Sequence, residues 1–191
     1  MDEYEKSVFL TQAQQQIIIG LYNGDNVEHQ SFESTEELRR YLVNLVKGIK
    51  ITEPVKSDNL IGMETYSVFY QLPSDLWFII QENINIKTAD CYNNTDIRVT
   101  PVKHDYYQKQ AHNPFRGINK TKALRLDIGD NIAEIVCSSD INYYYVRYMT
   151  KPSPIILIDL NDGLSIDNTD KKTECKMHEA LHRTIVETAV P

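Results

Sequence analysis

Residues Tyr143 to Ile158 read YYYVRYMTKPSPIILI, and the rest of the sequence can be interpreted outward from them. The first half, as far as Thr150, is rich in aromatic and β-branched residues, which favour a strand. Pro152 and Pro154 then remove two backbone donors and keep the chain extended. Four aliphatic residues follow, and they need cover from another element. The stretch therefore predicts a buried strand, a rigid corner and a second apolar segment.

Apolar segments separated by turn residues precede this stretch and predict further strands. They fall at residues 66–71, 76–86, 97–102, 124–128 and 132–136. Gly129-Asp130-Asn131 separates the last two segments, which is a hairpin signal. Because the segments are too close together for crossover helices, we expect an antiparallel sheet.

Helical patterns lie at both ends of the chain. A T-x-x-Q capping box at Thr11 and an apolar stripe predict a helix over about residues 11–22. An S-x-x-E box at Ser34 predicts a second helix that ends at Gly48, and the two helices can pair as a hairpin. A third apolar stripe predicts a helix over about residues 175–190.

These elements define the expected fold class. The chain is predicted to be α+β, with an antiparallel, sandwich- or barrel-like β domain over residues 49–172. An N-terminal helical hairpin is expected over residues 1–48 and a C-terminal helix over residues 173–191. At 191 residues, these parts suit one compact unit with helical extensions.

Composition and charge narrow the classes of function. Hydrophobic residues make up 41% of the chain, which is enough for a core, but no apolar run is long enough to span a membrane. The acidic N-terminus does not resemble a signal peptide, and Cys91, Cys137 and Cys175 form no CxxC pair. We therefore expect reduced thiols and an intracellular product, or one assembled inside a cell. The net charge of −7 opposes binding to DNA phosphates and suits only a passage through which DNA slides.

One string has the pattern of a zinc hydrolase. Residues 178–182 read HEALH, in which His178 and His182 would bind zinc and Glu179 would activate water on one helix face. Zincins take a third ligand from downstream, and only nine residues follow His182, so structural histidines fit better. We expect no enzyme activity, no cofactor and no catalytic or metal-binding residue, and we keep the zinc hydrolase as the alternative. A small nucleic-acid-binding module is a third hypothesis, which the acidic balance opposes.

Tyrosine is abundant, at 12 residues, and its rings can pack within strands or at subunit interfaces. A small domain with long exposed β edges tends to aggregate unless partners cover them. We therefore expect an oligomer, and its candidate interface residues are Tyr143, Tyr145, Arg147, Tyr148, Phe115 and Arg116.

Several short stretches, spread over nearly the whole chain, carry a family resemblance. In the first two thirds they are SVFLTQAQ at 7–14, LYNG at 21–24, SFESTEELRRYL at 31–42, VTPV at 99–102, DY at 105–106 and NPFR at 113–116. In the remainder they are YVRY at 145–148, KPSPIIL at 151–157, LSID at 164–167, TECKM at 173–177 and LHRTIVETAV at 181–190. In this order they resemble virion structural proteins of crAss-like bacteriophages, the tailed phages of gut Bacteroidetes.

The resemblance implies a ring protein of the head-to-tail connector, stacked below the portal. It implies a cyclic oligomer, of about twelve copies by analogy with portals, around a channel through which genomic DNA passes without specific binding. The implied partners are its own copies, the portal and neighbouring connector or tail proteins, in a virion assembled in the host bacterial cytoplasm without membrane contact. Asn168 stands where the family pattern has glycine, and asparagine also tolerates a left-handed backbone, so we expect the turn to survive.

Overall fold

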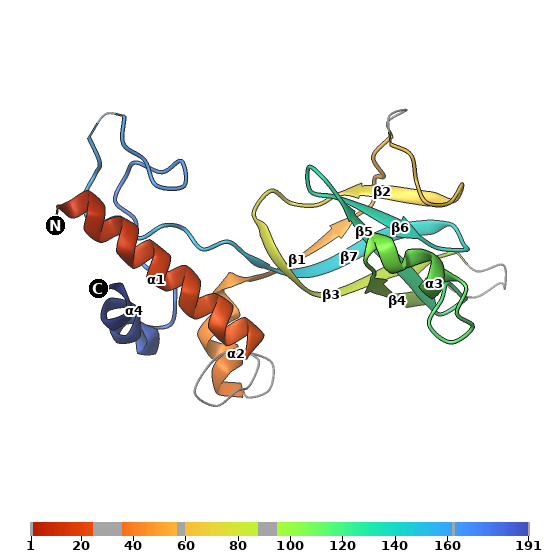
Figure 1. Ribbon diagram of the computed structural model, residues 1–191, viewed down its shortest axis with the longest axis horizontal. Helices are drawn as coiled ribbons and strands as arrows, with labels where there is room; N and C mark the ends of the chain where they lie inside the picture. The colour runs from red at the N-terminus through yellow and green to blue at the C-terminus, as the bar shows by residue number, and fades with distance from the viewer. Residues whose placement is uncertain (1, 25–35, 57–59, 88–94, 162, 191) are drawn as a thin grey trace. The chain divides into compact units, whose positions relative to one another are not determined.

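The computed structural model describes residues 2–24, 36–56, 60–87, 95–161 and 163–190, which divide into two compact units (Figure 1). Lys47–Thr150 form one, which we call the β unit. Met1–Val46 and Lys151–Pro191 form the other, which we call the helical unit. Among the described residues, none of the helices combines the length and the apolar character that crossing a membrane requires.

The stretch at residues 143–158 passes from one unit to the other. Its first half lies in strand β7 (Ile141–Thr150) of the β unit, and its second half belongs to the helical unit. Ile155 and Ile156 are buried there, as the need for cover predicts. The expected β range of 49–172 therefore differs from the β unit at residues 151–172, which group with the helices.

Seven strands form one sheet, in the order β1-β7-β3-β4-β5-β6-β2. They are β1 (Val46–Ile51), β2 (Ser67–Gln71), β3 (Leu76–Ile86), β4 (Thr95–Pro101), β5 (Lys122–Ile128), β6 (Ile132–Val136) and β7. The pairs β2–β6, β3–β4, β3–β7 and β5–β6 are antiparallel, as expected, but β4 and β5 are parallel. A parallel pair needs a crossover, and η2 (His104–Tyr106) with α3 (Tyr107–Ala111) lies in this connection. The expectation that no crossover helix fits is wrong at this pair.

The hairpin between β5 and β6 forms at the expected turn. Asp130 and Asn131 have φ angles of 62° and 57°, the left-handed pair that a type I′ hairpin turn requires. Ile128 and Ile132 face each other across it. The turn residues therefore lie where the hairpin was expected, and three residues, 129–131, separate the paired positions.

The sheet curls because both of its edge strands pack onto one core. Ile49 and Ile51 of β1 and Val68 and Tyr70 of β2 join the same cluster, in which Tyr144 of β7 is fully buried. A second cluster, which includes residues of α3, contains Tyr107, Leu124, Leu126 and Val136. The fold is α+β with a curled, mostly antiparallel sheet, which agrees with the barrel-like expectation (Figure 1).

An ion pair adjoins this core and connects three strands. Arg125 Nε of β5 lies 3.1 and 2.9 Å from the two carboxylate oxygens of Glu82 on β3, and the side chains are 8% and 5% exposed. The Tyr144 hydroxyl donates to Glu82 at 2.5 Å. Burial, reinforced by the Glu82 carboxylate, raises the pKa of Tyr144, so its hydroxyl keeps the proton that it donates.

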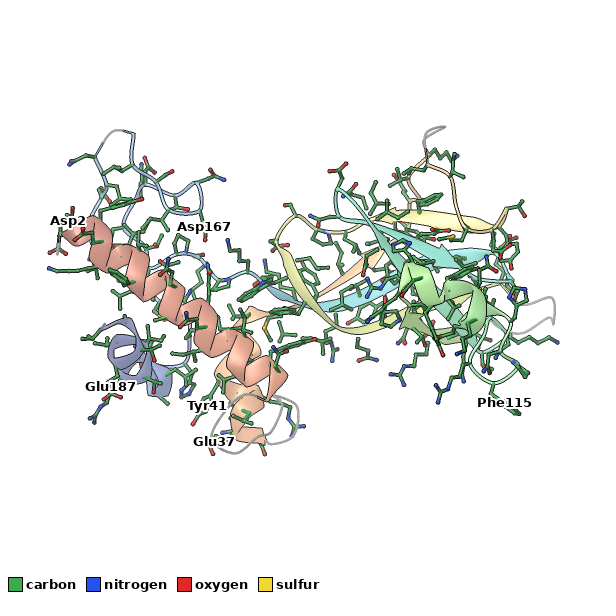
Figure 2. All side chains as sticks on the ribbon, in the orientation of Figure 1. Asp2, Glu37, Tyr41, Phe115, Asp167 and Glu187 are labelled. Atoms are coloured by element: carbon green, nitrogen blue, oxygen red, sulfur yellow. The ribbon has the colours of Figure 1, made fainter. Side chains whose placement is uncertain are left out.

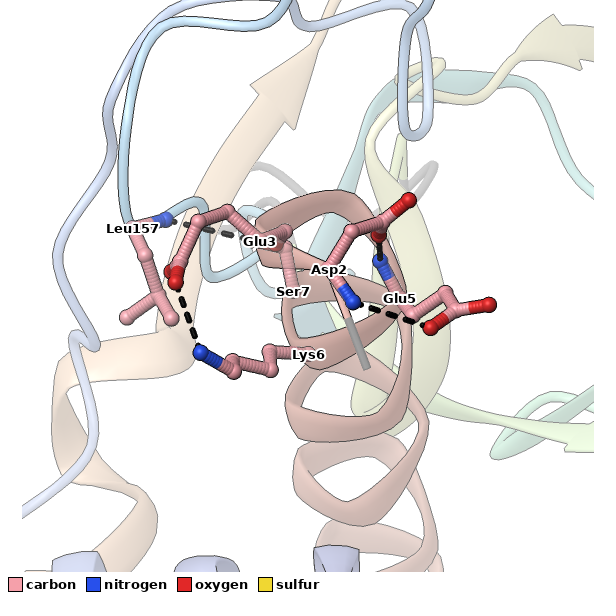
Figure 3. A network of polar contacts seen from close by, with 6 residues as sticks. All are labelled: Asp2, Glu3, Glu5, Lys6, Ser7 and Leu157. Atoms are coloured by element: carbon pink, nitrogen blue, oxygen red, sulfur yellow. Dashed lines mark hydrogen bonds and ion pairs between the residues drawn. The ribbon is translucent and has the colours of Figure 1, made fainter.

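Helix α1 (Glu3–Asn23) begins earlier than the sequence pattern predicts. Asp2 Oδ1 accepts from Glu5 N at 2.7 Å, and Glu5 Oε2 accepts from Asp2 N at 3.0 Å, so these two residues form the capping box (Figure 3). Thr11, the expected cap, lies inside the helix. The helix ends at Gly24, whose φ of 81° fits a left-handed C-cap.

The second helix is shorter than expected. α2 (Glu36–Leu42) continues as one turn of 3-10 helix, η1 (Val43–Leu45), and β1 follows directly. Gly48 is therefore a strand residue and not a C-cap, and a Cβ there would lie 2.8 Å from the Tyr145 hydroxyl oxygen. The expected capping residues 34–35 lie outside the described residues.

The C-terminal helix begins later than expected. Residues 175–178 are not helical, η3 (Glu179–Leu181) follows them, and α4 (His182–Ala189) packs against α1. The main helix partner of α1 is therefore α4, which the predicted pairing of the two N-terminal helices did not anticipate.

Candidate assembly surfaces

A polar stripe on α1 holds the extended segment 153–157 to this helix. Ser7, Thr11 and Gln14 recur at helical spacing, and all three side chains are buried. They form hydrogen bonds with alternate residues of the extended segment 153–157, as a neighbouring strand would in a sheet. Figure 3 shows the bond between Ser7 and Leu157. The bonds are Leu157 N to Ser7 Oγ at 3.2 Å, Ile155 N to Thr11 Oγ1 at 3.0 Å and Gln14 Nε2 to Ser153 O at 3.0 Å.

The same segment also pairs with Thr173. Ile156 and Thr173 exchange two backbone hydrogen bonds of 3.1 Å, and the Thr173 hydroxyl donates to Pro154 O. The Cys175 thiol then donates to Gln14 Oε1 at 3.4 Å, and burial raises the pKa of Cys175, which keeps this thiol protonated. The segment is thus held both by helix side chains and by another stretch of backbone.

A tight turn in the helical unit carries the expected asparagine. Ile166 and Thr169 exchange two backbone hydrogen bonds of 2.9 Å, and Asp167 and Asn168 between them have φ angles of 49° and 61°. Asn168 therefore adopts the left-handed backbone that glycine would otherwise supply, as expected. Lys151 Nζ binds the Asp167 carboxylate at 2.8 Å.

An apolar groove of about 290 Å³ opens on the helical unit. It is lined by residues of α1, of segment 153–157 and of the C-terminal end of the chain around α4: Lys6, Phe9, Leu10, Leu157, Val186, Ala189 and Val190. Phe9 is 38% exposed and Val186 54% exposed. Apolar side chains gathered at an open groove are typical of a surface that a partner covers.

Three of the six candidate interface residues lie on the outer face of β7. Tyr143, Tyr145 and Arg147 alternate with buried residues, and their own side chains are half-buried or exposed. Lys50 Nζ lies 3.8 Å from the centre of the Tyr143 ring. This face therefore presents aromatic rings beside cations, a composition that suits protein contacts.

Tyr148 differs from these three because it points into the core. It is 4% exposed, and its hydroxyl donates to Asp75 at 3.1 Å. Lys47 Nζ also binds this carboxylate, at 2.7 Å, and its hydrogen bond lowers the pKa of Asp75. The side chain of Tyr148 thus stabilises the β unit from within.

The other two candidates, Phe115 and Arg116, lie in a loop of the β unit whose backbone is held by hydrogen bonds. Asn113 Oδ1 accepts from Phe115 N at 2.9 Å and from Arg116 N at 3.0 Å. Gly117 N donates to Asn113 O at 2.7 Å, and Lys122 Nζ donates to Phe115 O at 2.7 Å. The Phe115 ring is nevertheless 81% exposed, and it projects from the ribbon at the tip of the loop (Figure 2).

The HEALH string does not have the geometry of a zinc site. His178 precedes the helical turn and caps it, since its Nδ1 accepts from Ala180 N at 3.2 Å. His182 Nε2 donates to Met177 O at 3.1 Å. Because His178 lies outside the helix, the two rings do not follow one another on a helix face. Within the described ranges no three His, Cys, Asp or Glu side chains gather so as to hold a metal ion, and the zinc-hydrolase alternative is not supported.

Sequence reasoning missed both the polar stripe and the groove. The spacing of Ser7, Thr11 and Gln14 is visible in the sequence, but a polar stripe at helical spacing normally faces water. The one further signal is Pro152 and Pro154. They keep the segment extended but remove two backbone donors, which disfavours pairing within a sheet.

Comparisons with known proteins agree in placing the chain in one family. The family model described as phage tail ring protein 3/4 matches residues 1–191. The chain is similar to "Ring protein 3" of Bacteroides phage crAss001, with 42% identity over 193 aligned positions that cover 100% of this chain and 83% of that protein. It is also similar to "Ring protein 4/5" of the same phage, with 25% identity over 200 positions that cover 100% and 81%.

Proposed function

Since this chain belongs to the phage tail ring protein 3/4 family, we propose that about twelve copies of it form a closed ring that joins the capsid portal to the tail. The observation that carries the proposal is the match of the whole chain to a crAss-like phage protein named as a ring protein. A ring protein is a structural subunit of the phage particle, and the closed ring, its copy number and its place at the portal are the proposed refinements.

The distribution of charge supports a ring that does not hold DNA. Lys47–Thr150 contains twelve basic and twelve acidic residues, so the net charge of −7 is carried entirely by the helical unit. A channel lined by acidic or neutral side chains repels the phosphate backbone and lets DNA slide. In the proposed function, genomic DNA passes through the ring without specific binding.

A ring also needs a contact between two different surfaces of neighbouring copies. Heterologous contacts of this kind close into a ring when the rotation between copies allows it. The chain offers two units of different chemistry, one acidic and largely helical, the other neutral overall with tyrosines and cations on its sheet. The half-buried candidates Tyr143 and Tyr145 and the exposed candidates Arg147, Phe115 and Arg116 belong to the second.

The test is the number of copies in purified virions. Quantitative mass spectrometry should find this chain in a ratio to the portal protein near one, or near a small integer. Absence from the virion would overturn the proposed function, and so would a non-stoichiometric trace that washing removes. A matched control is a major capsid peptide measured in the same sample, which calibrates recovery.

A further inference from the structure

The Phe115 loop is built to present its aromatic side chain. The Asn113 carboxamide and the Lys122 ammonium fix the backbone on both sides of the ring. Gly117 allows the tight return, because a Cβ there would lie 2.3 Å from Ala111 O. An exposed Phe on a fixed backbone loses little conformational entropy when a partner covers it, which is the property of an interface anchor.

The groove on the helical unit has the size for such an anchor. A cavity of about 150 Å³ suffices to hold benzene, and this groove offers about 290 Å³ between α1 and α4. Apart from Lys6, all of its lining side chains are apolar. Lys6 is already held by Glu3, at 2.6 Å, so the ring that enters meets few unsatisfied polar groups.

The charges around the two surfaces are complementary. Residues 107–122, which carry the Phe115 loop, contain four basic side chains and no acidic one. They are Lys109, Arg116, Lys120 and Lys122. The groove belongs to the acidic unit, and within three residues of its lining residues there are four acidic side chains (Glu3, Glu5, Asp159 and Glu187) against two basic ones (Lys6 and Arg183), a net charge of −2. Opposite charges at the rim of an apolar contact speed association and orient it.

From the loop, the groove and the charges, we infer that Phe115 of one copy seats in the α1–α4 groove of a second copy of this chain. The inference rests on the proposed ring and names its contact: the β unit of each copy meets the helical unit of the next. Because every copy carries both the loop and the groove, the contact is heterologous and repeats around a closed ring.

The experiment is photo-crosslinking from position 115 in assembled particles. A plasmid supplies the chain with p-azidophenylalanine in place of Phe115 during infection, and purified virions are irradiated. We expect a product of twice the chain mass, with crosslinked peptides from residues 6–10 or 186–190. A crosslink to another part of a second copy, to the same copy, to a different protein or to nothing in the incorporated chain would overturn the inference.

Two controls keep the result specific. Ile61, which is 89% exposed in the same unit, receives the same photo-crosslinker and should give no product with the groove. Val186→Asp places a carboxylate in the groove at a position that is 54% exposed, so the fold tolerates it while the crosslink from position 115 is lost. Phe115→Ala should weaken association of copies roughly thirtyfold, as expected for an anchor residue.

The copy number measured on the same virions separates the two ideas. Wild-type stoichiometry with a crosslink elsewhere would end the Phe115 contact and leave the ring intact as a proposal. A wild-type chain missing from virions would end the proposed function itself.

Discussion

Each of the two units of this ring protein is stabilised internally by a different set of interactions. The β unit closes around apolar side chains from its strands, with the Glu82–Arg125 pair beside them. The helical unit also has an apolar core, to which Ile18, Leu42 and Ile185 belong, and buried polar side chains of α1 complete the hydrogen bonds of segment 153–157 within it. Both units depend on the burial of apolar side chains, but the β unit adds a desolvated charge pair, whereas the helical unit adds buried hydroxyl and amide groups that bond segment 153–157. The two units should therefore lose stability under different substitutions.

The chain contains probes that can tell these failures apart. Trp77, the single tryptophan, lies in β3, so its fluorescence reports on the β unit. Helical circular dichroism reports mainly on the helical unit, since α1 is by far the longest helix among the described residues.

The largest effect is expected at the buried ion pair. Glu82→Gln leaves the Arg125 guanidinium buried without its main counterion, which should lower the free energy of unfolding by about 3 kcal/mol. The loss should appear in the Trp77 fluorescence transition during denaturation in urea. Glu187→Gln in the helical unit, followed by helical circular dichroism, is the control, because its pair with Arg183 is exposed and should contribute less than about 0.5 kcal/mol. Equal shifts in the two variants would contradict the role of burial.

The second effect tests the polar stripe. Thr11→Val keeps the side-chain shape but leaves Ile155 N without its acceptor, which should cost about 2 kcal/mol. The helical signal should melt earlier, with faster hydrogen exchange at Ile155, while Trp77 fluorescence stays unchanged. Thr188→Val on the exposed face of α4 is the matched control and should have little effect. If both signals shift together in Thr11→Val, the two units unfold as one and the comparison fails.

A smaller effect is expected at the left-handed turn of the helical unit. Asn168→Ala should cost about 1 kcal/mol, because alanine at a φ of 61° brings Cβ close to the neighbouring backbone. Asn168→Gly should leave the helical melting transition in place or raise it slightly. Thermal melting of the three proteins side by side gives the order, and a glycine variant as weak as the alanine variant would refute the backbone explanation.

The smallest effect concerns alkaline pH. Burial raises the pKa of Tyr70 from 10.0 to about 12, so between these values the unfolded chain releases a proton that the folded chain keeps. The contribution to stability is therefore complete below about pH 10 and is lost as the pH rises toward 12. Near pH 10.5, Tyr70→Phe should recover about 0.8 kcal/mol of the alkaline loss relative to the parent chain. Denaturation of both proteins at pH 8 and 10.5 measures it, and an unchanged difference would show that Tyr70 ionises normally.

The sequence predicted the structure correctly where a turn or strand depends mainly on its own residues. The β5–β6 turn follows from Asp130 and Asn131 alone, and the left-handed Asn168 follows from its own tolerance of that backbone. The strands and the α+β class likewise follow from runs of aromatic and β-branched residues.

Prediction failed where a distant partner decides the structure. The run at 155–158 has the composition of a sheet strand, but its hydrogen bonds go to side chains of α1, more than a hundred residues earlier in the chain, and to the backbone of Thr173. Gly48 reads as a helix end, but it is a strand residue beside Tyr145. Of the candidate surfaces, the exposed Phe115 and Arg116 were visible as residues, whereas the groove joins α1 and α4 and exists only in the folded unit.

The discontinuity of the helical unit has a consequence for the order of events on the ribosome. α1 leaves the ribosome first, yet Thr173 and Cys175, which complete its surroundings, emerge only after the whole β unit. At usual elongation rates this delay amounts to roughly 10–30 s. During that time the face of α1 that waits for segment 153–157 consists of hydroxyl and amide groups, which water can solvate without promoting aggregation. An apolar stripe in the same place would stay exposed for equally long and would promote aggregation. The polar stripe therefore suits a nascent chain in which the segment that binds the first helix is synthesised only after the whole β unit.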